Sequence, residues 1–156
     1  MAVRYYDWIA HFGRRTPHKT AVIDLASERR FTYAQFDARI SRLAAHLRDQ
    51  LKILRGDRVA VLALNNTDTL EVQFACGRLG AVFLPLNTRL TVPELQYIVG
   101  DAAPKVMVHD TDLSETALAV SKLCNIESTL LLGPDGSYEA AIASAKPLDR
   151  IEHVTL

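Results

Sequence analysis

The stretch that decides the fold is "RVAVLALNNTDTLEVQFACGRLGAVFLPL", residues 58–86. It contains two near-continuous apolar runs, 58–64 and 81–86, on either side of a helical segment at 67–79. Strands that are apolar on both faces are typical of a parallel sheet whose two sides are covered by helices. The stretch therefore predicts a β-α-β unit of such a sheet.

The same pattern continues towards the C-terminus, where strand-like runs occupy 105–110 and 129–133. The regular spacing indicates βα repeats over residues 57–133. We predict an α/β fold, with a mostly parallel sheet that has helices on both faces. The four strands are expected to begin 23, 24 and 23 residues apart, near Val59, Val82, Val106 and Thr129.

Two further helical segments, 92–100 and 112–124, separate these strands. Thr91 stands three residues before Glu94, which is the spacing of a capping box at a helix start. The last of these helices is expected to begin at Asp112, whose side chain would cap it.

A glycine pair, Gly77 and Gly80, stands between a helix and the following strand. A dinucleotide-binding loop needs the reverse order, with its glycines after a strand and before a helix. Gly80 is therefore expected to be the left-handed residue that ends the helix, and Gly77 to allow a close helix contact.

The residues before the repeats predict an N-terminal helix followed by short strands. Strand candidates at 20–25 and 29–33 are separated by a turn-sized gap, which favours a hairpin. A short helix is predicted before the hairpin, and Pro17 would end it. Its apolar residues have helical spacing and are expected to pack in the core. These residues are Tyr5, Trp8, Ile9 and Phe12.

A longer helix follows the hairpin, and its start is signalled twice. Thr32 and Gln35 have capping-box spacing, and Phe31 and Phe36 have the spacing of a hydrophobic staple. Arg39 is expected to lie outside the apolar stripe of this helix. The stripe consists of Phe36, Ile40, Leu43, Ala44 and Leu47. Near the C-terminus a turn is expected at 133–137, followed by a short helix over 138–145 that Pro147 ends.

Composition limits the possible classes of function. The chain has 156 residues and equal numbers of basic and acidic side chains, 18 of each, so net charge indicates no nucleic-acid partner. Its two cysteines, Cys76 and Cys124, have no paired spacing and suit reduced thiols. No apolar run is long enough for a transmembrane segment, and the N-terminus lacks the apolar core of a signal peptide. A cytoplasmic location is expected.

Ligands of open α/β sheets bind outside the carboxyl ends of the strands. In this sequence, polar residues follow the first two predicted strands of the parallel sheet. These are 65–67 and 87–89. Arg89 could offer its guanidinium to a phosphate or carboxylate, or it could pair with an acid such as Glu94. Asn66 and Thr91 could equally serve as helix caps.

Nothing in the sequence forms a self-sufficient catalytic or metal site. The five histidines lack metal-ligand spacing, and only His109, at a strand end, has a position suited to a ligand. No nucleophile elbow is present, so we assign no catalytic residue and no metal ligand in this chain.

The order of the segments over residues 4–110 resembles the N-terminal region of the acyl-adenylate-forming enzymes, also called the AMP-dependent synthetase/ligase superfamily. The most specific part is "GRLGAVFLPLNTRL", residues 77–90, which is similar to the family segment Gly-Ala-x-x-x-Pro-Leu-Asn-Pro-Arg-Leu. Asn87 makes the chain look most like the fatty-acid–CoA ligase type of acyl-CoA synthetase. Thr88 replaces the commoner proline, which loosens the backbone there.

The resemblance implies a two-step ligase that uses ATP, Mg²⁺ and CoA. A small carboxylic acid, fatty or aromatic, would be converted to an acyl-adenylate and then to a CoA thioester. In some acyl-CoA ligases the arginine at the position of Arg89 helps to hold the phosphates of CoA. Asn87 is expected to support the turn rather than touch substrate. The family also allows a homodimer.

The family's Ser/Thr/Gly-rich phosphate loop, its hinge and its mobile C-terminal domain with the catalytic lysine do not occur in this sequence. We therefore expect residues 1–156 to be a single N-terminal subdomain that binds no cofactor alone, is inactive alone and needs the remainder of a parent enzyme. Two alternatives stay open. The chain could be a stand-alone doubly wound binding or interaction module, or its parent could pass the acyl-adenylate to a carrier protein.

Overall fold

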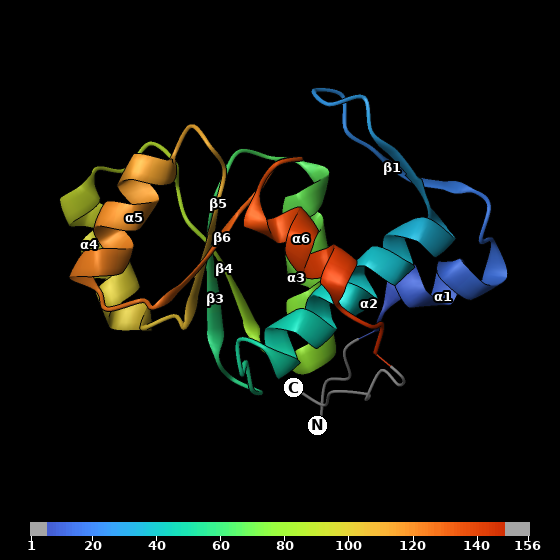
Figure 1. The fold of residues 1–156 in the computed structure, drawn as a ribbon, viewed down its shortest axis with the longest axis horizontal. Helices are drawn as coiled ribbons and strands as arrows, with labels where there is room; N and C mark the ends of the chain where they lie inside the picture. Colours follow the sequence, from blue (N-terminus) through green and yellow to red (C-terminus); the bar gives the residue numbers. More distant parts are fainter. Residues whose placement is uncertain (1–5, 149–156) are drawn as a thin grey trace.

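The computed structural model describes residues 6–148 and shows a central sheet between two layers of helices (Figure 1). The helices are α1 (Trp8–Arg15), α2 (Tyr33–Asp49), α3 (Thr67–Leu79), α4 (Val92–Ala102), α5 (Ser114–Leu123) and α6 (Ser137–Ser144). The strands are β1 (Thr20–Ile23), β2 (Arg30–Thr32), β3 (Arg58–Leu62), β4 (Val82–Pro85), β5 (Val106–His109) and β6 (Ser128–Leu131).

The central sheet has four strands in the order β4-β3-β5-β6, and every neighbouring pair is parallel. Its register places Val59 of β3 opposite Phe83 of β4 and Val106 of β5. Each strand begins within one residue of its predicted start. The prediction of a parallel sheet built from βα repeats is confirmed.

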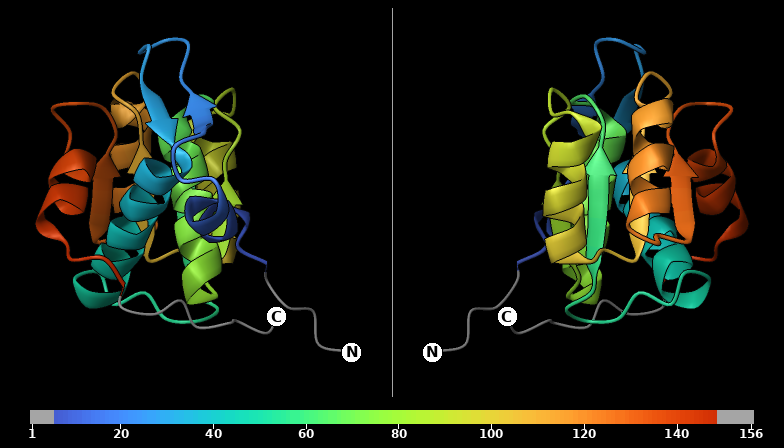
Figure 2. Two further views of the ribbon diagram at one scale, coloured as in Figure 1. Left: turned by 90° about the vertical axis from the view of Figure 1, so that its right-hand side faces the viewer. Right: turned by 90° about the vertical axis from the view of Figure 1, so that its left-hand side faces the viewer.

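Helices cover both faces of this sheet, as the apolar strands required. Helices α4 and α5 lie on one face, and α2, α3 and α6 lie on the other (Figures 1 and 2). Alternate strand residues point to opposite sides. Val59 and Val61 join the core beneath α2, α3 and α6, while Ala60 and Leu62 join the core beneath α4 and α5.

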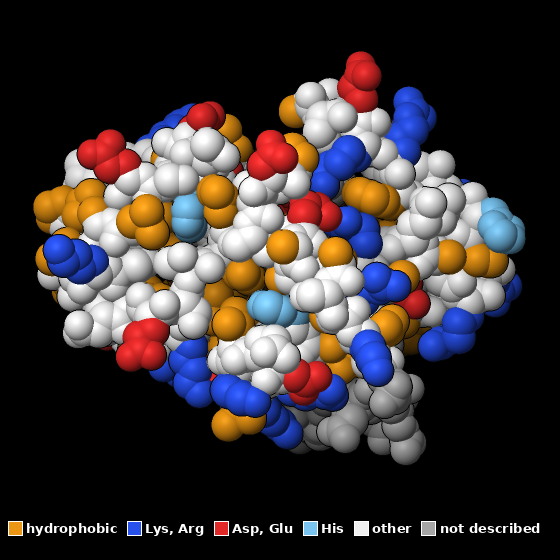
Figure 3. Space-filling view, in the orientation of Figure 1, with side chains coloured by type: hydrophobic (Ala, Val, Ile, Leu, Met, Phe, Trp, Pro, Cys, Tyr) orange, Lys and Arg blue, Asp and Glu red, His pale blue; other side chains and the backbone are white. Residues whose placement is uncertain are grey.

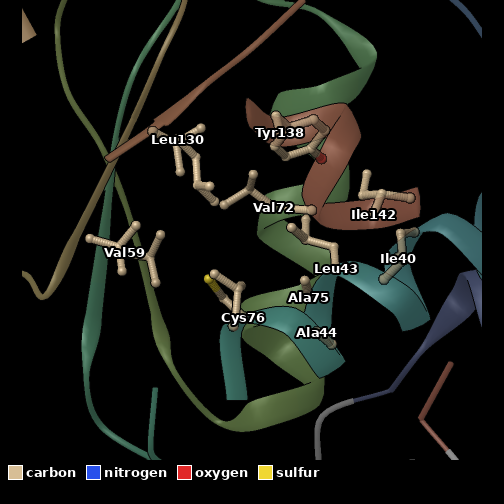
Figure 4. Packing of buried hydrophobic residues seen from close by; sticks show 14 of the residues in the cluster. Ile40, Leu43, Ala44, Val59, Val72, Ala75, Cys76, Leu130, Tyr138 and Ile142 are labelled. Atoms are coloured by element: carbon tan, nitrogen blue, oxygen red, sulfur yellow. The ribbon is translucent and has the colours of Figure 1, made fainter. Parts of the chain in front are cut away.

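The first of these cores contains side chains from three helices that meet the sheet (Figure 4). Ile40 and Leu43 from α2, Val72 from α3 and Tyr138 from α6 are fully buried there. The predicted apolar stripe of α2 is thus confirmed. Cys76 lies in the same core as a free thiol, and burial raises its pKa to about 12.

Most of the predicted helix ends are also confirmed. Gly80 ends α3 in the left-handed conformation with a φ of 67°. Capping boxes at Thr32 and Thr91 start α2 and α4. The predicted cap at Asp112 is wrong, because α5 begins only at Ser114. The residue before the helix is Leu113, and no side chain caps α5; the backbone N–H of Leu113 donates a hydrogen bond to Asp110 Oδ1 at 3.1 Å in the preceding turn.

The N-terminal part consists of α1 and an antiparallel β1–β2 hairpin, as expected. The predicted packing of Trp8 is wrong, because its side chain is 59% exposed. Helix α1 has only eight residues, and its buried side is narrow and holds Ile9 and Ala10. Trp8 lies about 100° around the helix from Ile9, and its ring meets that of Tyr6 edge-on, with ring centroids 5.4 Å apart. The expected packing of Tyr5 lies outside the described residues.

Gly136 fixes the start of α6 against the outer edge of β6. A Cβ atom on this residue would clash with the backbone carbonyl oxygen of Leu131, so an alanine there forces the backbone apart. We expect Gly136→Ala to lower the free energy of unfolding by about 1–3 kcal/mol in urea titrations. Gly100→Ala is the matched control, because nothing lies within 4 Å of that site. In the exposed helix α4 it should stabilise by about 0.5–1 kcal/mol. Equal effects of the two changes would contradict this contact.

Candidate functional site

A hollow with a volume of about 800 Å³ lies at the carboxyl ends of β3, β5 and β6. The chain passes from β3 to β4 on one side of β3, and β5 then lies on the other side. This reversal leaves a crevice between the ends of β3 and β5, which is where open α/β sheets bind ligands. On the sheet side the hollow is lined by Asn66, Asp110, Thr111, Asp112, Gly133 and Pro134.

The polar side chains at the ends of β3 and β5 already accept hydrogen bonds from backbone N–H groups. Asn66 caps α3, with its Oδ1 accepting from the N–H of Thr69 at 2.8 Å. The Oδ2 of Asp110 accepts from the N–H of Leu64 at 2.9 Å and ties the two strand ends together. These residues shape the floor of the hollow, so the alternative of Asn66 as a helix cap is confirmed.

The opposite wall of the hollow belongs to the hairpin, α2 and α6. It is formed by Asp24, Ser27, Arg29, Arg39 and Glu139. Figure 3 shows Lys/Arg and Asp/Glu side chains next to one another below the hairpin, where the surface is hollowed.

Arg39 lies between two carboxylates that come from different helices. Its guanidinium donates to Glu71 on α3 at 2.5 and 3.1 Å. It also donates to Glu139 on α6 at 2.9 and 2.7 Å. Such two-pronged contacts of a guanidinium with a carboxylate are among the strongest hydrogen bonds in proteins. Arg39 therefore joins α2, α3 and α6.

Arg29 adds the hairpin to the same group of charges. Its Nη2 donates to Asp68 at 2.7 Å and to the hydroxyl of Thr67 at 3.2 Å, and its Nη1 donates to Glu139 at 3.2 Å. The ring of Phe31 lies 5.7 Å from the guanidinium carbon of Arg29 and 4.9 Å from that of Arg39. Both arginines thus have an aromatic surface beside them as well as carboxylates.

Glu71 is the most deeply buried carboxylate of this group, with none of its surface exposed. The hydroxyl of Tyr138, itself fully buried, donates to Glu71 Oε2 at 2.8 Å. Burial, the largest cause, and the neighbouring Asp68 both raise the pKa of Glu71, which is about 7 once all its contacts are included. The contacts with Arg39 and Tyr138 act in the opposite direction and only partly offset this. The group formed by Arg29, Arg39, Asp68, Glu71, Tyr138 and Glu139 is called the charge cluster below.

The charges around the hollow do not suit a polyphosphate. Two guanidinium groups line it, and carboxylates already occupy both. Acidic side chains outnumber them, at Asp24, Asp68, Asp110, Asp112 and Glu139. An incoming phosphate would meet net negative charge and would have to displace existing ion pairs.

Arg89 lies elsewhere, beyond the carboxyl end of β4, and does not line the hollow. Its side chain is exposed, and among residues 6–148 no carboxylate is within ion-pair distance of it. Glu94, its expected partner, instead accepts from the N–H and hydroxyl of Thr91. The Oδ1 of Asn87 accepts from the N–H of Arg89 at 3.0 Å, which closes a tight turn.

His109, at the end of β5, is buried and faces its own chain. Its Nδ1 lies 3.1 Å from the carbonyl oxygen of Asp110 and 3.3 Å from the hydroxyl of Ser114. These contacts explain its position without a ligand. Within residues 6–148 there is no group of three or more His, Cys, Asp or Glu side chains that could hold a metal ion. No helix in that range has the length and apolar character to cross a membrane.

The charge cluster was not predicted from the sequence, and Arg39 was expected outside the core. Its members lie far apart along the chain, so no local motif connects them. One signal was available on α3. Asp68 and Glu71 fall at helical spacing with buried Val72 and Ala75, which places two carboxylates on a face that must pack inward. Buried carboxylates need cationic partners.

Comparisons with known proteins point to one family. The sequence profile of the family described as "AMP-binding enzyme" matches residues 9–153. A feruloyl-CoA synthase of Amycolatopsis sp is 40% identical over 135 residues, which are 86% of this chain and 26% of that protein. An indoleacetate–CoA ligase of Aromatoleum aromaticum is 35% identical over 144 residues, which cover 87% of this chain and 27% of that protein.

Solved structures agree with the sequence comparisons. A fatty acyl CoA synthetase of Mycobacterium tuberculosis superposes with a TM-score of 0.82 and 28% identity. The superposition covers 92% of this chain and 29% of that one. The chain thus spans between a quarter and a third of the length of these three relatives.

Proposed function

The chain belongs to the family of AMP-binding enzymes, and we propose that it forms the N-terminal part of an ATP-dependent acyl-CoA ligase. The proposed reaction joins a carboxylic acid to ATP, giving an acyl-adenylate, and then passes the acyl group to the thiol of CoA. The observation that carries the proposal is the match of nearly the whole chain, in sequence and in fold, to the same part of acyl-CoA ligases. A cytoplasmic location is part of the proposal.

The described residues do not fit a triphosphate with its magnesium ion. Carboxylates surround the hollow and occupy its two arginines, so this wall offers no free cation to phosphate groups. We therefore assign the chain a scaffolding part in the ligase, with ATP and Mg²⁺ held by other residues of the enzyme. Residues 1–156 alone are expected to form no acyl-adenylate.

Arg89 does fit a single phosphate group of CoA. Its guanidinium is exposed, and the turn closed by Asn87 holds its backbone at the carboxyl edge of the sheet. A charged planar donor in this position can bind phosphate through two parallel hydrogen bonds. Asn87 contributes only by holding the turn.

The reaction is tested in the complete polypeptide to which these residues belong. It should be incubated with ATP, Mg²⁺ and a panel of fatty and aromatic acids. The release of pyrophosphate and the CoA thioester are measured separately, the latter by mass spectrometry. Acid-dependent pyrophosphate release followed by a thioester supports the ligase. If pyrophosphate is released but the acyl group is transferred only to a carrier protein, the carrier protein and not CoA is the acceptor. If no acid causes pyrophosphate release, the proposal is overturned.

Replacing Arg89 by alanine tests the CoA contact in that enzyme. Loss of a charge-assisted hydrogen bond costs about 1.5–3 kcal/mol at most, so the KM for CoA should rise roughly ten- to 150-fold. The rate of acyl-adenylate formation should stay nearly unchanged. Arg14→Ala, an exposed arginine on α1, is the matched control and should leave both quantities unchanged. If adenylate formation falls while the KM for CoA is unaltered, the role of Arg89 is wrong.

A further inference from the structure

A groove with a volume of about 530 Å³ lies between the β1–β2 hairpin and the start of α3. Its walls carry large apolar side chains that are open to solvent, Ile23 and Leu25 from the hairpin and Leu70 from α3. Leu25 is 89% exposed, and Leu64, which directly precedes the groove residue Asn65, is 60% exposed. A gathering of exposed apolar side chains around a recess is typical of an interaction site.

The groove continues into the hollow at the carboxyl ends of the strands. Asp24, Ala26 and Asn66 line both recesses. The tip of the hairpin, which extends beyond the carboxyl ends of the strands (Figures 1 and 2), therefore belongs to the wall of each. The groove and the hollow are together called the edge surface below.

The hollow gives the edge surface a negative charge. Five carboxylates line it against the two guanidinium groups of Arg29 and Arg39, and both guanidinium groups already bind carboxylates. Among residues 6–148, Asp110 and Asp112 have no Lys, Arg or His side chain within ion-pair distance. Unpaired negative charge beside an apolar groove suits a partner that brings an apolar and a cationic side chain together.

This charge argues against a second copy of the chain as the partner. In a symmetric dimer the same surface patch meets itself, so two acidic hollows would face each other. Like charges brought together oppose association. Nucleic acids are disfavoured for the same reason, because their phosphate groups are negative.

The hairpin itself needs a covering segment. Strands β1 and β2 have four and three residues and form a sheet of their own, separate from the central one. A two-stranded ribbon is only marginally stable in water unless a further layer packs on it. Because this chain spans between a quarter and a third of three relatives, two thirds or more of such an enzyme would lie outside it and could supply that layer.

We propose that the edge surface is the docking site for a segment of the ligase polypeptide outside residues 1–156. That segment places an apolar side chain in the groove beside Leu25 and Leu64, and a lysine or arginine beside Asp110 and Asp112. The inference rests on the proposed function only in requiring the longer polypeptide of such a ligase. It does not depend on which acid or which acceptor the enzyme uses.

Hydrogen exchange of the 156-residue chain and of the complete polypeptide tests the docking. The probes are the hydrogen-bonded amides of the hairpin, such as that of Asp24, which donates to the carbonyl oxygen of Arg29 at 2.9 Å. Their protection factors are compared with those of β3 in the same sample. We expect hairpin protection to be at least about tenfold greater in the complete polypeptide. Equal protection in the two polypeptides would overturn the proposal.

Substitutions at the exposed leucines separate docking from folding. Leu25→Asp combined with Leu64→Asp should leave the exchange of the 156-residue chain unchanged, because both side chains are exposed there. In the complete polypeptide it should lower hairpin protection to the level of the 156-residue chain. The matched control is Leu118→Asp combined with Leu123→Asp on α5, two leucines that are half exposed, and it should leave hairpin protection unaltered. An unchanged hairpin in the Leu25→Asp, Leu64→Asp variant of the complete polypeptide would contradict the docking.

The cationic contact has its own variant. Asp112→Lys, at an exposed position, should lower hairpin protection in the complete polypeptide by about two- to fivefold, as expected for a surface ion pair. Glu115→Lys, an exposed acid on α5, is the control and should have no such effect. If the 156-residue chain instead sediments as a dimer that Leu25→Asp with Leu64→Asp dissociates, a second copy occupies the surface and the proposal is wrong.

Failure of the docking and failure of the ligase reaction are distinguishable, because amide protection needs no turnover. A complete polypeptide with a protected hairpin and no acid-dependent pyrophosphate release supports the docking and refutes the reaction. Pyrophosphate release by a polypeptide whose hairpin is no better protected than in the 156-residue chain refutes the docking alone.

Discussion

Replacing Arg39 by methionine is expected to lower the free energy of unfolding by about 3–5 kcal/mol at pH 8. The substitution removes the only guanidinium in direct contact with Glu71 among the described residues and leaves Glu139 with Arg29 alone. An isolated carboxylate in this position must either remain charged without a partner or take up a proton. Urea unfolding followed by circular dichroism measures the loss.

The effect of Arg39→Met should depend on pH and on Glu71. At pH 5 most of the Glu71 population can be protonated, so the loss should be clearly smaller than at pH 8. Arg39→Met combined with Glu71→Leu should recover a large part of the stability, because a buried ion pair can be replaced by apolar side chains. Arg42→Met on the same helix is the control and should cost less than about 1 kcal/mol. A similar small cost for Arg39→Met would contradict the cluster's part in holding the fold.

The second large effect is expected for Arg78, whose side chain is fully buried on α3. It donates to Asp7 at 2.7 Å and to both the side chain and the carbonyl oxygen of Asp37. Asp7 also caps α1 by accepting from the N–H of Ala10. Arg78 therefore ties α1 and α2 to α3, and its removal leaves two carboxylates without their partner.

We expect Arg78→Met to lower the free energy of unfolding by about 3 kcal/mol. That value lies at the low end for buried pairs, because the side chain of Asp37 is 32% exposed and can be hydrated. Hydrogen exchange should show α1 opening before the sheet. Arg15→Met, at the exposed end of α1, is the control and should change stability by less than about 0.5 kcal/mol. Unaltered protection of α1 in Arg78→Met would show that apolar contacts alone hold this helix.

The features that could be predicted from the sequence are those fixed by local pattern. The runs beginning near Val59, Val82 and Val106 are apolar at successive positions, and only strands covered on both faces can bury them. Gly80 was predictable because a left-handed helix end has a strong preference for glycine. The hairpin, the capping boxes and the short last helix follow from equally short-range signals.

The errors have a different origin. Asp112 is of a residue type that often caps helices, but α5 begins two residues after it, at Ser114, because the sequence does not fix a helix start to one residue. Trp8 has helical spacing with Phe12, but how many sides of α1 are covered depends on how that helix meets α2. The charge cluster was missed because Arg29, Arg39 and Glu139 meet only in the folded chain. Buried charge is a tertiary property, and it cannot be derived from spacing alone.

Titration calorimetry with ATP compares the isolated chain directly with the enzyme to which we assign it. ATP is titrated into folded residues 1–156 and, in parallel, into the complete polypeptide. We expect saturable heat only from the complete polypeptide, because the charges around the hollow of the isolated chain do not accommodate a triphosphate. Saturable binding of ATP by residues 1–156, or its absence in the complete polypeptide, would contradict the assignment of this chain as the scaffolding part of an acyl-CoA ligase.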